Sequence, residues 1–151
     1  APLVDQLGFD AAIDYRNDDV AARLAELAPD GVDVFFDNVG GDILDTVLDN
    51  LAMRARVVIC GAVSQYASMD AVQGPSNYLR LAERQSRMEG FAVYFFPDSH
   101  APATAELTRW LADGSITMPE HVVSGIEAFG SAVEALYQGD NIGKTLVKID
   151  R

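Results

Sequence analysis

The chain has 151 residues, of which 49% are hydrophobic and 23% charged, with a formal net charge of −12. This length and composition predict a globular protein, and the acidic balance argues against a nucleic acid partner. No apolar run approaches the roughly 20 residues that cross a bilayer, and the start of the chain lacks a signal pattern, so we expect a cytoplasmic protein. One cysteine and two histidines exclude an internal disulfide and argue against a zinc site.

The first half of the chain alternates between short apolar runs and helical spacing, which is typical of βα units in a parallel sheet. Residues 1–8 look like the end of a helix. Asp18 and Asp19 are placed to cap a second helix, which the Pro-Asp-Gly turn at 29–31 ends, and Gly41 opens a third helix. The predicted strands are 11–15, 32–36 and 56–60.

The second half continues the alternation after a polar loop over residues 64–77. Its apolar patterns predict three helices and two strands. The helices are expected near 78–86, 106–111 and 128–137, and the strands over 88–96 and 145–149. Together the two halves predict an α/β fold with a parallel sheet and helices on both faces.

Two predicted strands end in small and polar residues, at 36–41 and at 60–66. Ligands of such sheets lie beyond the carboxyl ends of parallel strands. Asn38 is therefore a candidate ligand contact, and the glycines that follow it let a ligand approach the backbone. Cys60 closes an apolar strand with no histidine nearby, which predicts a buried, unreactive thiol whose backbone lines the groove.

Three nucleotide-enzyme signatures are absent from the sequence. There is no Gly-x-Gly-x-x-Gly turn, and no Tyr is followed four places later by Lys. The segment 139–145 contains Gly-Lys-Thr, but only three residues separate its glycines and no strand is predicted before it. Since a doubly wound fold opens with a glycine-rich turn, we expect an incomplete doubly wound sheet that begins in the middle of the fold.

The chain contains a series of separated motifs, at 7–10, 14–15, 29–31, 36–41, 60–62, 64–66, 74–78, 87–91 and 139–144. In this order they resemble the zinc-independent medium-chain dehydrogenases/reductases, in the branch of prostaglandin, alkenal and curcumin reductases. The resemblance runs nearly end to end. It implies a single domain over residues 1–151, the C-terminal portion of an NADP-binding Rossmann domain without its first strands and glycine-rich turn. Residues 139–151 would return to an absent catalytic domain.

The resemblance also implies a function, the NADPH-dependent reduction of the C=C bond of α,β-unsaturated ketones and aldehydes. Tyr66 is the implied hydroxyl donor to the developing enolate, Tyr78 lines the substrate pocket, and no residue binds a metal. Family members often dimerise by pairing the strand that corresponds to 88–96, so a homodimer is expected. The implied cofactor contacts are Tyr15, Asn38, Cys60, Gly61, Ala62, Ser64, Tyr66, Phe91, Ala92, Val93 and Asn141.

Two other classes of protein remain open at this point. A methyltransferase fold also ends a strand in Asp or Asn, and it would bind S-adenosylmethionine rather than NADPH. The missing glycine-rich turn is also compatible with a non-catalytic assembly module that binds no cofactor.

Overall fold

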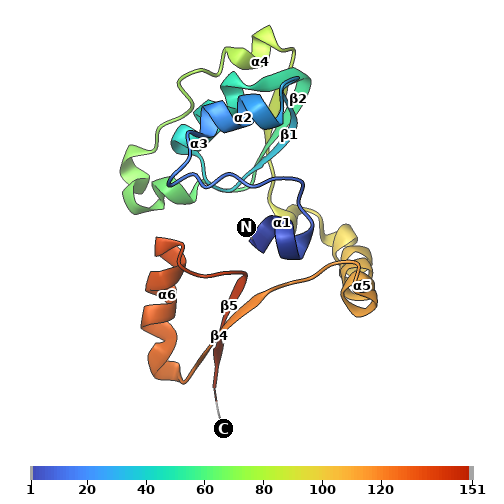
Figure 1. Ribbon diagram of the computed structural model, residues 1–151, viewed down its shortest axis with the longest axis vertical. Helices are drawn as coiled ribbons and strands as arrows, with labels where there is room; N and C mark the ends of the chain where they lie inside the picture. Colours follow the sequence, from blue (N-terminus) through green and yellow to red (C-terminus); the bar gives the residue numbers. More distant parts are fainter. Residues whose placement is uncertain (1, 150–151) are drawn as a thin grey trace. The chain divides into compact units, whose positions relative to one another are not determined.

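The computed structural model describes residues 2–149, in two compact units that meet between Pro97 and Asp98. Each unit has its own parallel sheet, as Figure 1 shows. The predicted α/β fold is confirmed, while the prediction that the chain forms a single domain stays a prediction.

The first unit alternates helices with the strands of its sheet. Its helices are α1 (Pro2–Leu7), α2 (Val20–Leu27), α3 (Gly41–Asp49) and α4 (Arg80–Glu83), and its strands are β1 (Val32–Asp37), β2 (Leu51–Ile59) and β3 (Arg87–Gly90). Two short 3₁₀ helices, Val63–Ala71 and Val93–Phe95, follow β2 and β3. As predicted, Asp19 caps α2 by accepting a hydrogen bond from the backbone N–H of Ala22 at 3.0 Å.

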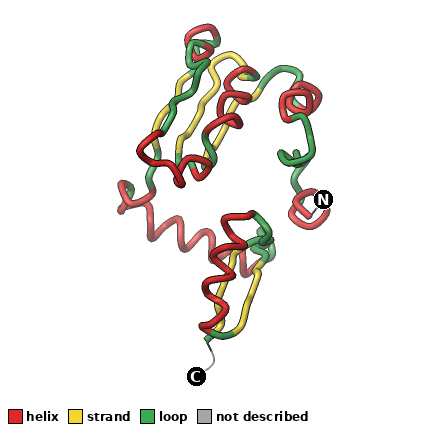
Figure 2. Tube along the Cα trace, turned by 90° about the vertical axis from the view of Figure 1, so that its left-hand side faces the viewer, coloured by secondary structure: helices red, strands yellow, loops and turns green. Residues whose placement is uncertain are grey.

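The three strands lie in the order β1-β2-β3, and both pairs are parallel. Figure 2 shows strands side by side in yellow, with helices in red. Asp37 pairs with Ile59, and Ile59 pairs with Gly90. These three residues are the last of their strands, so the carboxyl ends of the strands stand level with one another. This edge is where an open parallel sheet binds its ligand.

The core of the first unit forms between α3 and β2. Leu48 and Val57 are fully buried, and Leu24 of α2 packs against the same cluster. Helix α3 presents Leu44, Val47 and Leu48 on one face, as its helical spacing predicts. Because α3 follows β1 and precedes β2, this core fixes the position of the turn between β1 and α3.

The second unit contains α5 (Pro97–Asp113), β4 (Glu120–Ser124), a 3₁₀ helix (Ile126–Ala128), α6 (Phe129–Gln138) and β5 (Lys144–Lys148). Strands β4 and β5 pair in parallel, and α6 connects them. The final strand and the helix before it were predicted, but β4 was missed. Its sequence, Glu-His-Val-Val-Ser, contains only two apolar residues and gives almost no period-2 signal.

Several predicted boundaries are wrong. Residues 11–15 form a loop, half-buried at 11–13, rather than a strand, because no described strand lies beside them to pair with. The run 88–96 is a strand only to Gly90, since its pairing with β2 stops where β2 ends at Ile59. Residues 63–71 of the expected loop form a 3₁₀ helix, and the helix expected at 78–86 is shortened to α4.

Within residues 2–149, no helix has both the length and the apolar character needed to cross a membrane.

Candidate functional site

The candidate site lies where β1, β2 and β3 end. The N–H groups of Cys60 and Gly61 donate to the carbonyl oxygen of Asp37 at 2.8 and 3.1 Å, and the N–H of Phe91 donates to that of Ile59 at 2.8 Å. These bonds extend the hydrogen bonding of the sheet just beyond its last paired residues. They bring three of the predicted contacts, Asn38, the backbone of residues 60–62 and Phe91, to one edge of the sheet.

Asp37 shapes the turn from β1 to α3. Its side chain is 1% exposed, and Oδ1 accepts hydrogen bonds from the N–H groups of Val39 and Gly40 at 2.8 and 3.0 Å. Gly40 has φ +70°, a left-handed conformation that favours glycine. Sequence reasoning missed this role of Asp37, although a short acidic residue just before Val-Gly-Gly is the signal of an Asx turn.

Tyr66 and Gly61 approach each other closely at this edge. The Tyr66 hydroxyl accepts a hydrogen bond from the N–H of Ala62 at 3.3 Å. A Cβ atom added at Gly61 would lie 2.8 Å from that hydroxyl and 3.6 Å from the carbonyl oxygen of Asn38. Only glycine therefore leaves the hydroxyl where it is, and among residues 2–149 no hydrogen bond of the Tyr66 proton is found. The hydroxyl remains able to donate to a ligand.

The loop that carries Tyr66 is tied to the turn after β1. Ser64 Oγ donates to the carbonyl oxygen of Val39 at 2.6 Å, and the backbone N–H of Ser64 donates to the same oxygen at 3.1 Å. The N–H of Val63 donates to the carbonyl oxygen of Asn38 at 3.0 Å. Ser64 is thus brought to the site, where its hydroxyl is already engaged as a donor to the backbone.

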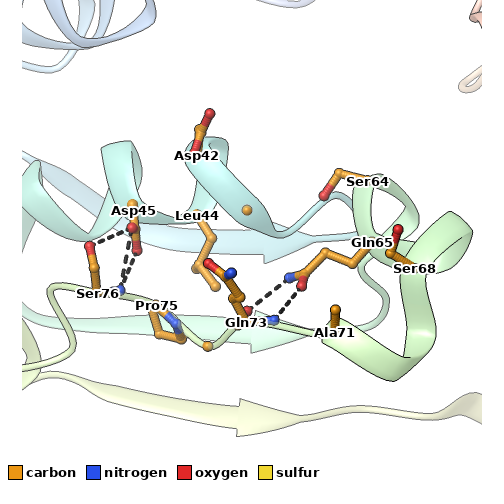
Figure 3. A pocket seen from close by; sticks show the side chains of 12 residues that line it. Asp42, Leu44, Asp45, Ser64, Gln65, Ser68, Ala71, Gln73, Pro75 and Ser76 are labelled. Atoms are coloured by element: carbon orange, nitrogen blue, oxygen red, sulfur yellow. Dashed lines mark hydrogen bonds between the residues drawn. The ribbon is translucent and has the colours of Figure 1, made fainter.

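Behind this loop lies a polar pocket of about 400 Å³ (Figure 3). Its walls include Asp42 and Asp45 of α3 together with Gln65, Gln73 and Ser76 from the loop. Asp45 accepts from Ser76 Oγ at 2.6 Å and from its backbone N–H at 3.1 Å. The near end of the loop is therefore anchored to the turn after β1, and its far end to helix α3.

Cys60 is exposed, which corrects the prediction of a buried thiol. Strand β2 ends at Ile59, so Cys60 is the first residue beyond the paired strand and has no neighbour to cover it. Its backbone N–H still continues the sheet, as described above.

An aromatic cluster follows β3. The ring of Phe91 lies edge-on to that of Phe36 with centroids 6.0 Å apart, and it stacks on Phe96 at 5.3 Å. Ala92 precedes the 3₁₀ helix that begins at Val93, whose side chain is 57% exposed. Of the three residues expected to contact a cofactor here, Phe91 lies closest to the β1 edge, through Phe36.

Two predicted site residues of the first unit, Tyr15 and Tyr78, are exposed side chains away from these hydrogen bonds, and a third, Asn141, belongs to the second unit. Tyr15 is 63% exposed and lies under the guanidinium of Arg16, 5.9 Å from the ring centre. Tyr78 is exposed just before α4. Asn141 belongs to the second unit, where its side-chain amide donates to the carbonyl oxygen of Gly143 at 2.9 Å.

The ion pair nearest to the pocket joins α3 to α4. Arg80 Nε donates to Asp49 Oδ1 at 2.8 Å, and Nη1 donates to Glu83 at 2.7 Å. The hydrogen bond from Arg80 lowers the pKa of Asp49 below its ordinary value. Both side chains are about half exposed, so this pair contributes little to stability and mainly orients α4.

The chain is similar to known dehydrogenases and reductases. The sequence profile of a family described as zinc-binding dehydrogenase matches residues 7–147. The chain is 35% identical to a 2-alkenal reductase (NADP(+)-dependent) of Nicotiana tabacum and 34% identical to (+)-pulegone reductase of Mentha piperita, covering 99% of this chain in each case. The crystal structure of CurA from Vibrio vulnificus in complex with NADPH superimposes with a TM-score of 0.88 at 34% identity.

The match covers 99% of this chain and 46% of the CurA chain. The chain likewise spans 43% and 44% of the lengths of the two plant reductases.

Proposed function

Since the chain belongs to the zinc-binding dehydrogenase family, whose profile covers residues 7–147, we propose that it supplies the cofactor-binding strand ends of an NADPH-dependent reductase. The resemblance noted in the sequence is confirmed by this match and by the similarity to alkenal and pulegone reductases. The proposed reaction adds one hydride and one proton across the C=C bond of an α,β-unsaturated ketone or aldehyde. The observation that carries the proposal is the level ending of β1, β2 and β3 at Asp37, Ile59 and Gly90, which brings the residues that follow, Asn38, Gly61 and Phe91, to one edge.

The residues at this edge fit a nicotinamide dinucleotide. A Cβ at Gly61 would lie 2.8 Å from the Tyr66 hydroxyl, so the glycine lets this hydroxyl stand close to the backbone at the strand ends. Asn38 and the backbone of residues 60–62 would hold the cofactor, with Ser64 and residues 91–93 beside it. Tyr15 and Asn141 are proposed as further contacts on the resemblance alone. When bound, the cofactor supplies the hydride.

Tyr66 is the proposed catalytic residue. Reduction of the C=C bond places negative charge on the carbonyl oxygen of the substrate, and a hydrogen-bond donor aimed at that oxygen lowers the barrier. The Tyr66 hydroxyl accepts from the N–H of Ala62 and so keeps its own proton for the substrate. Tyr78 is proposed to line the substrate pocket.

The family's description names zinc. No group of three or more His, Cys, Asp or Glu side chains within residues 2–149 is placed to hold a metal ion. None of these residues is therefore assigned as a zinc ligand.

A homodimer is a second proposal, supported by the position of β3. In the described sheet β3 is an edge strand, with β2 on one side and no strand on the other. The residues just beyond it, Tyr94 and Phe95, are 71% and 76% exposed. An unpaired edge next to exposed aromatic side chains favours pairing with a second copy.

The proposed cofactor is tested by titrating the purified chain with NADPH and NADH, with energy transfer from Trp110 to the nicotinamide as the signal. Saturable binding that prefers NADPH is the expected result. Binding of S-adenosylmethionine instead would support the methyltransferase alternative, and a folded chain that binds neither ligand would support the assembly module. Enone-dependent oxidation of NADPH by the whole protein tests the reaction itself.

A further inference from the structure

Two hydrogen bonds from the side chain of Gln65 to Gln73, which we call the Gln65 clasp, close the loop that carries Tyr66. The amide of Gln65 makes two hydrogen bonds to the backbone of Gln73: Nε2 donates to the carbonyl oxygen at 3.0 Å, and Oε1 accepts from the N–H at 2.7 Å (Figure 3). The planar amide thus pairs with one residue of backbone as a neighbouring strand would. The side chain of Gln73 takes no part in these two bonds.

The clasp also touches the turn after β1. A Cβ at Gly40 would lie 3.4 Å from Gln65 Nε2, so the Gln65 amide lies against this turn. Its neighbour Ser64 is bonded to Val39, two residues beyond the end of β1. Gln65 therefore links three segments: the turn after β1, the start of the loop and the end of the loop.

Tyr66 follows Gln65 directly, yet little else holds its hydroxyl. The Tyr66 side chain is 49% exposed, and its one hydrogen bond, from Ala62, is long at 3.3 Å. The position of the hydroxyl over Gly61 depends on the backbone at 65–66, because neither burial nor a strong hydrogen bond fixes the ring. That backbone is held by the Gln65 clasp, by the bonds of Ser64 and by the hydrogen bond from the Gln65 N–H to the carbonyl oxygen of Ala62 at 2.9 Å.

We propose that Gln65 is a positioning residue for the Tyr66 hydroxyl: its two hydrogen bonds to Gln73 hold the loop in the conformation that sets the hydroxyl at the strand ends. This inference rests on the proposed function, in which Tyr66 donates to the substrate. Gln65 acts through Tyr66 and touches neither cofactor nor substrate. Its loss should therefore slow turnover more than it weakens cofactor binding.

The test compares Gln65→Met with Gln73→Met in the whole protein. Both changes replace an amide with an apolar side chain of similar size, but only the first removes the clasp, since Gln73 contributes backbone groups. We expect Gln65→Met to lower kcat by about 10- to 100-fold, the effect of misplacing a reacting group by about 1 Å, with KM for NADPH within about twofold. Gln73→Met should leave both constants near those of the unchanged protein.

A double-mutant cycle separates positioning from general loss of structure. In a Tyr66→Phe background the hydroxyl is already absent, so adding Gln65→Met should lower kcat no further. A similar further loss in that background would overturn the inference and leave the proposed function standing, as would equal kcat values for the Gln65 and Gln73 variants. Absence of enone-dependent NADPH oxidation in the unchanged protein would instead overturn the proposed function, and this inference with it.

Folding of the variants is checked by hydrogen exchange. In Gln65→Met the Gln73 amide should exchange faster, while the core amides of β2 keep their protection. If Gln65→Met does not fold, Gln65→Asn replaces it. Asparagine keeps the amide group, but its side chain is shorter by one methylene and cannot reach both backbone groups of Gln73.

Discussion

Replacing Gly61 with alanine tests whether the close approach of Tyr66 matters for ligand binding. The new Cβ would lie 2.8 Å from the Tyr66 hydroxyl, whereas ordinary contacts begin near 3.4 Å. The hydroxyl must therefore retreat by about 0.6 Å, a distance on the scale that affects positioned groups. The hydrogen bond from Ala62 is already 3.3 Å long and would break.

The cost to folding should be small and the cost to function large. The displaced group is the end of a half-exposed side chain, and water can replace one hydrogen bond, so the free energy of unfolding should fall by less than about 1 kcal/mol. We expect kcat to fall by about 10- to 100-fold in an enone assay of the whole protein. Urea unfolding measures the first quantity and steady-state kinetics the second.

Gly90→Ala is the matched control at the same edge of the sheet. No atom lies within 4 Å of a Cβ added at Gly90, so this substitution should leave the unfolding free energy and kcat close to those of the unchanged protein. In a Tyr66→Phe background the Gly61→Ala change should lose most of its effect, because the clashing oxygen is gone. The reasoning is refuted if Gly61→Ala and Gly90→Ala give the same kcat.

Three further changes test the fold around the site. Gly31→Ala should lower the free energy of unfolding by about 2–4 kcal/mol in urea, since the residue has φ +92° and its Cβ would lie 2.5 Å from a backbone nitrogen of β2; a loss below about 1 kcal/mol would contradict this. Asp19→Ala should lower the free energy of unfolding by about 1 kcal/mol, because it removes the N-cap of α2. Asp19→Asn should retain most of that stability, because asparagine is also a good N-cap. Arg80→Met should raise the pKa of Asp49 in an NMR titration, because the hydrogen bond from Arg80 is the main cause that lowers it. Because the pKa of Asp49 is lowered in the folded protein, its contribution to stability is complete above the unfolded pKa and disappears as pH falls through the folded pKa. The destabilisation by Arg80→Met should therefore vanish in acid. Equal destabilisation at acid and neutral pH would contradict this.

The sequence predicted elements whose signals are local. The cap of α2 at Asp19, the opening of α3 at Gly41 and the apolar face of α3 all follow from side chains and backbone within a few residues of one another. The resemblance, which depends on motif order along the chain, was likewise visible without a structure.

Strand boundaries were less predictable, because a strand exists only where a partner lies beside it. The β-rich run after Met88 leaves the sheet at Gly90, where β2 ends, and residues 11–15 have no described partner. Cys60 was predicted to be buried on the pattern of its own strand, yet it lies one residue beyond the last pair of β2 and is exposed.

The sequence alone determined the family, the α/β class and the polar strand ends at Asn38 and Gly61. Each of these depends on neighbouring residues or on the order of motifs along the chain. The clasp of Gln65 on Gln73 and the position of Tyr66 over Gly61 were decided only by the tertiary structure. A glutamine carries no signal of which backbone it will pair with, because its two hydrogen bonds depend on how the loop returns in space.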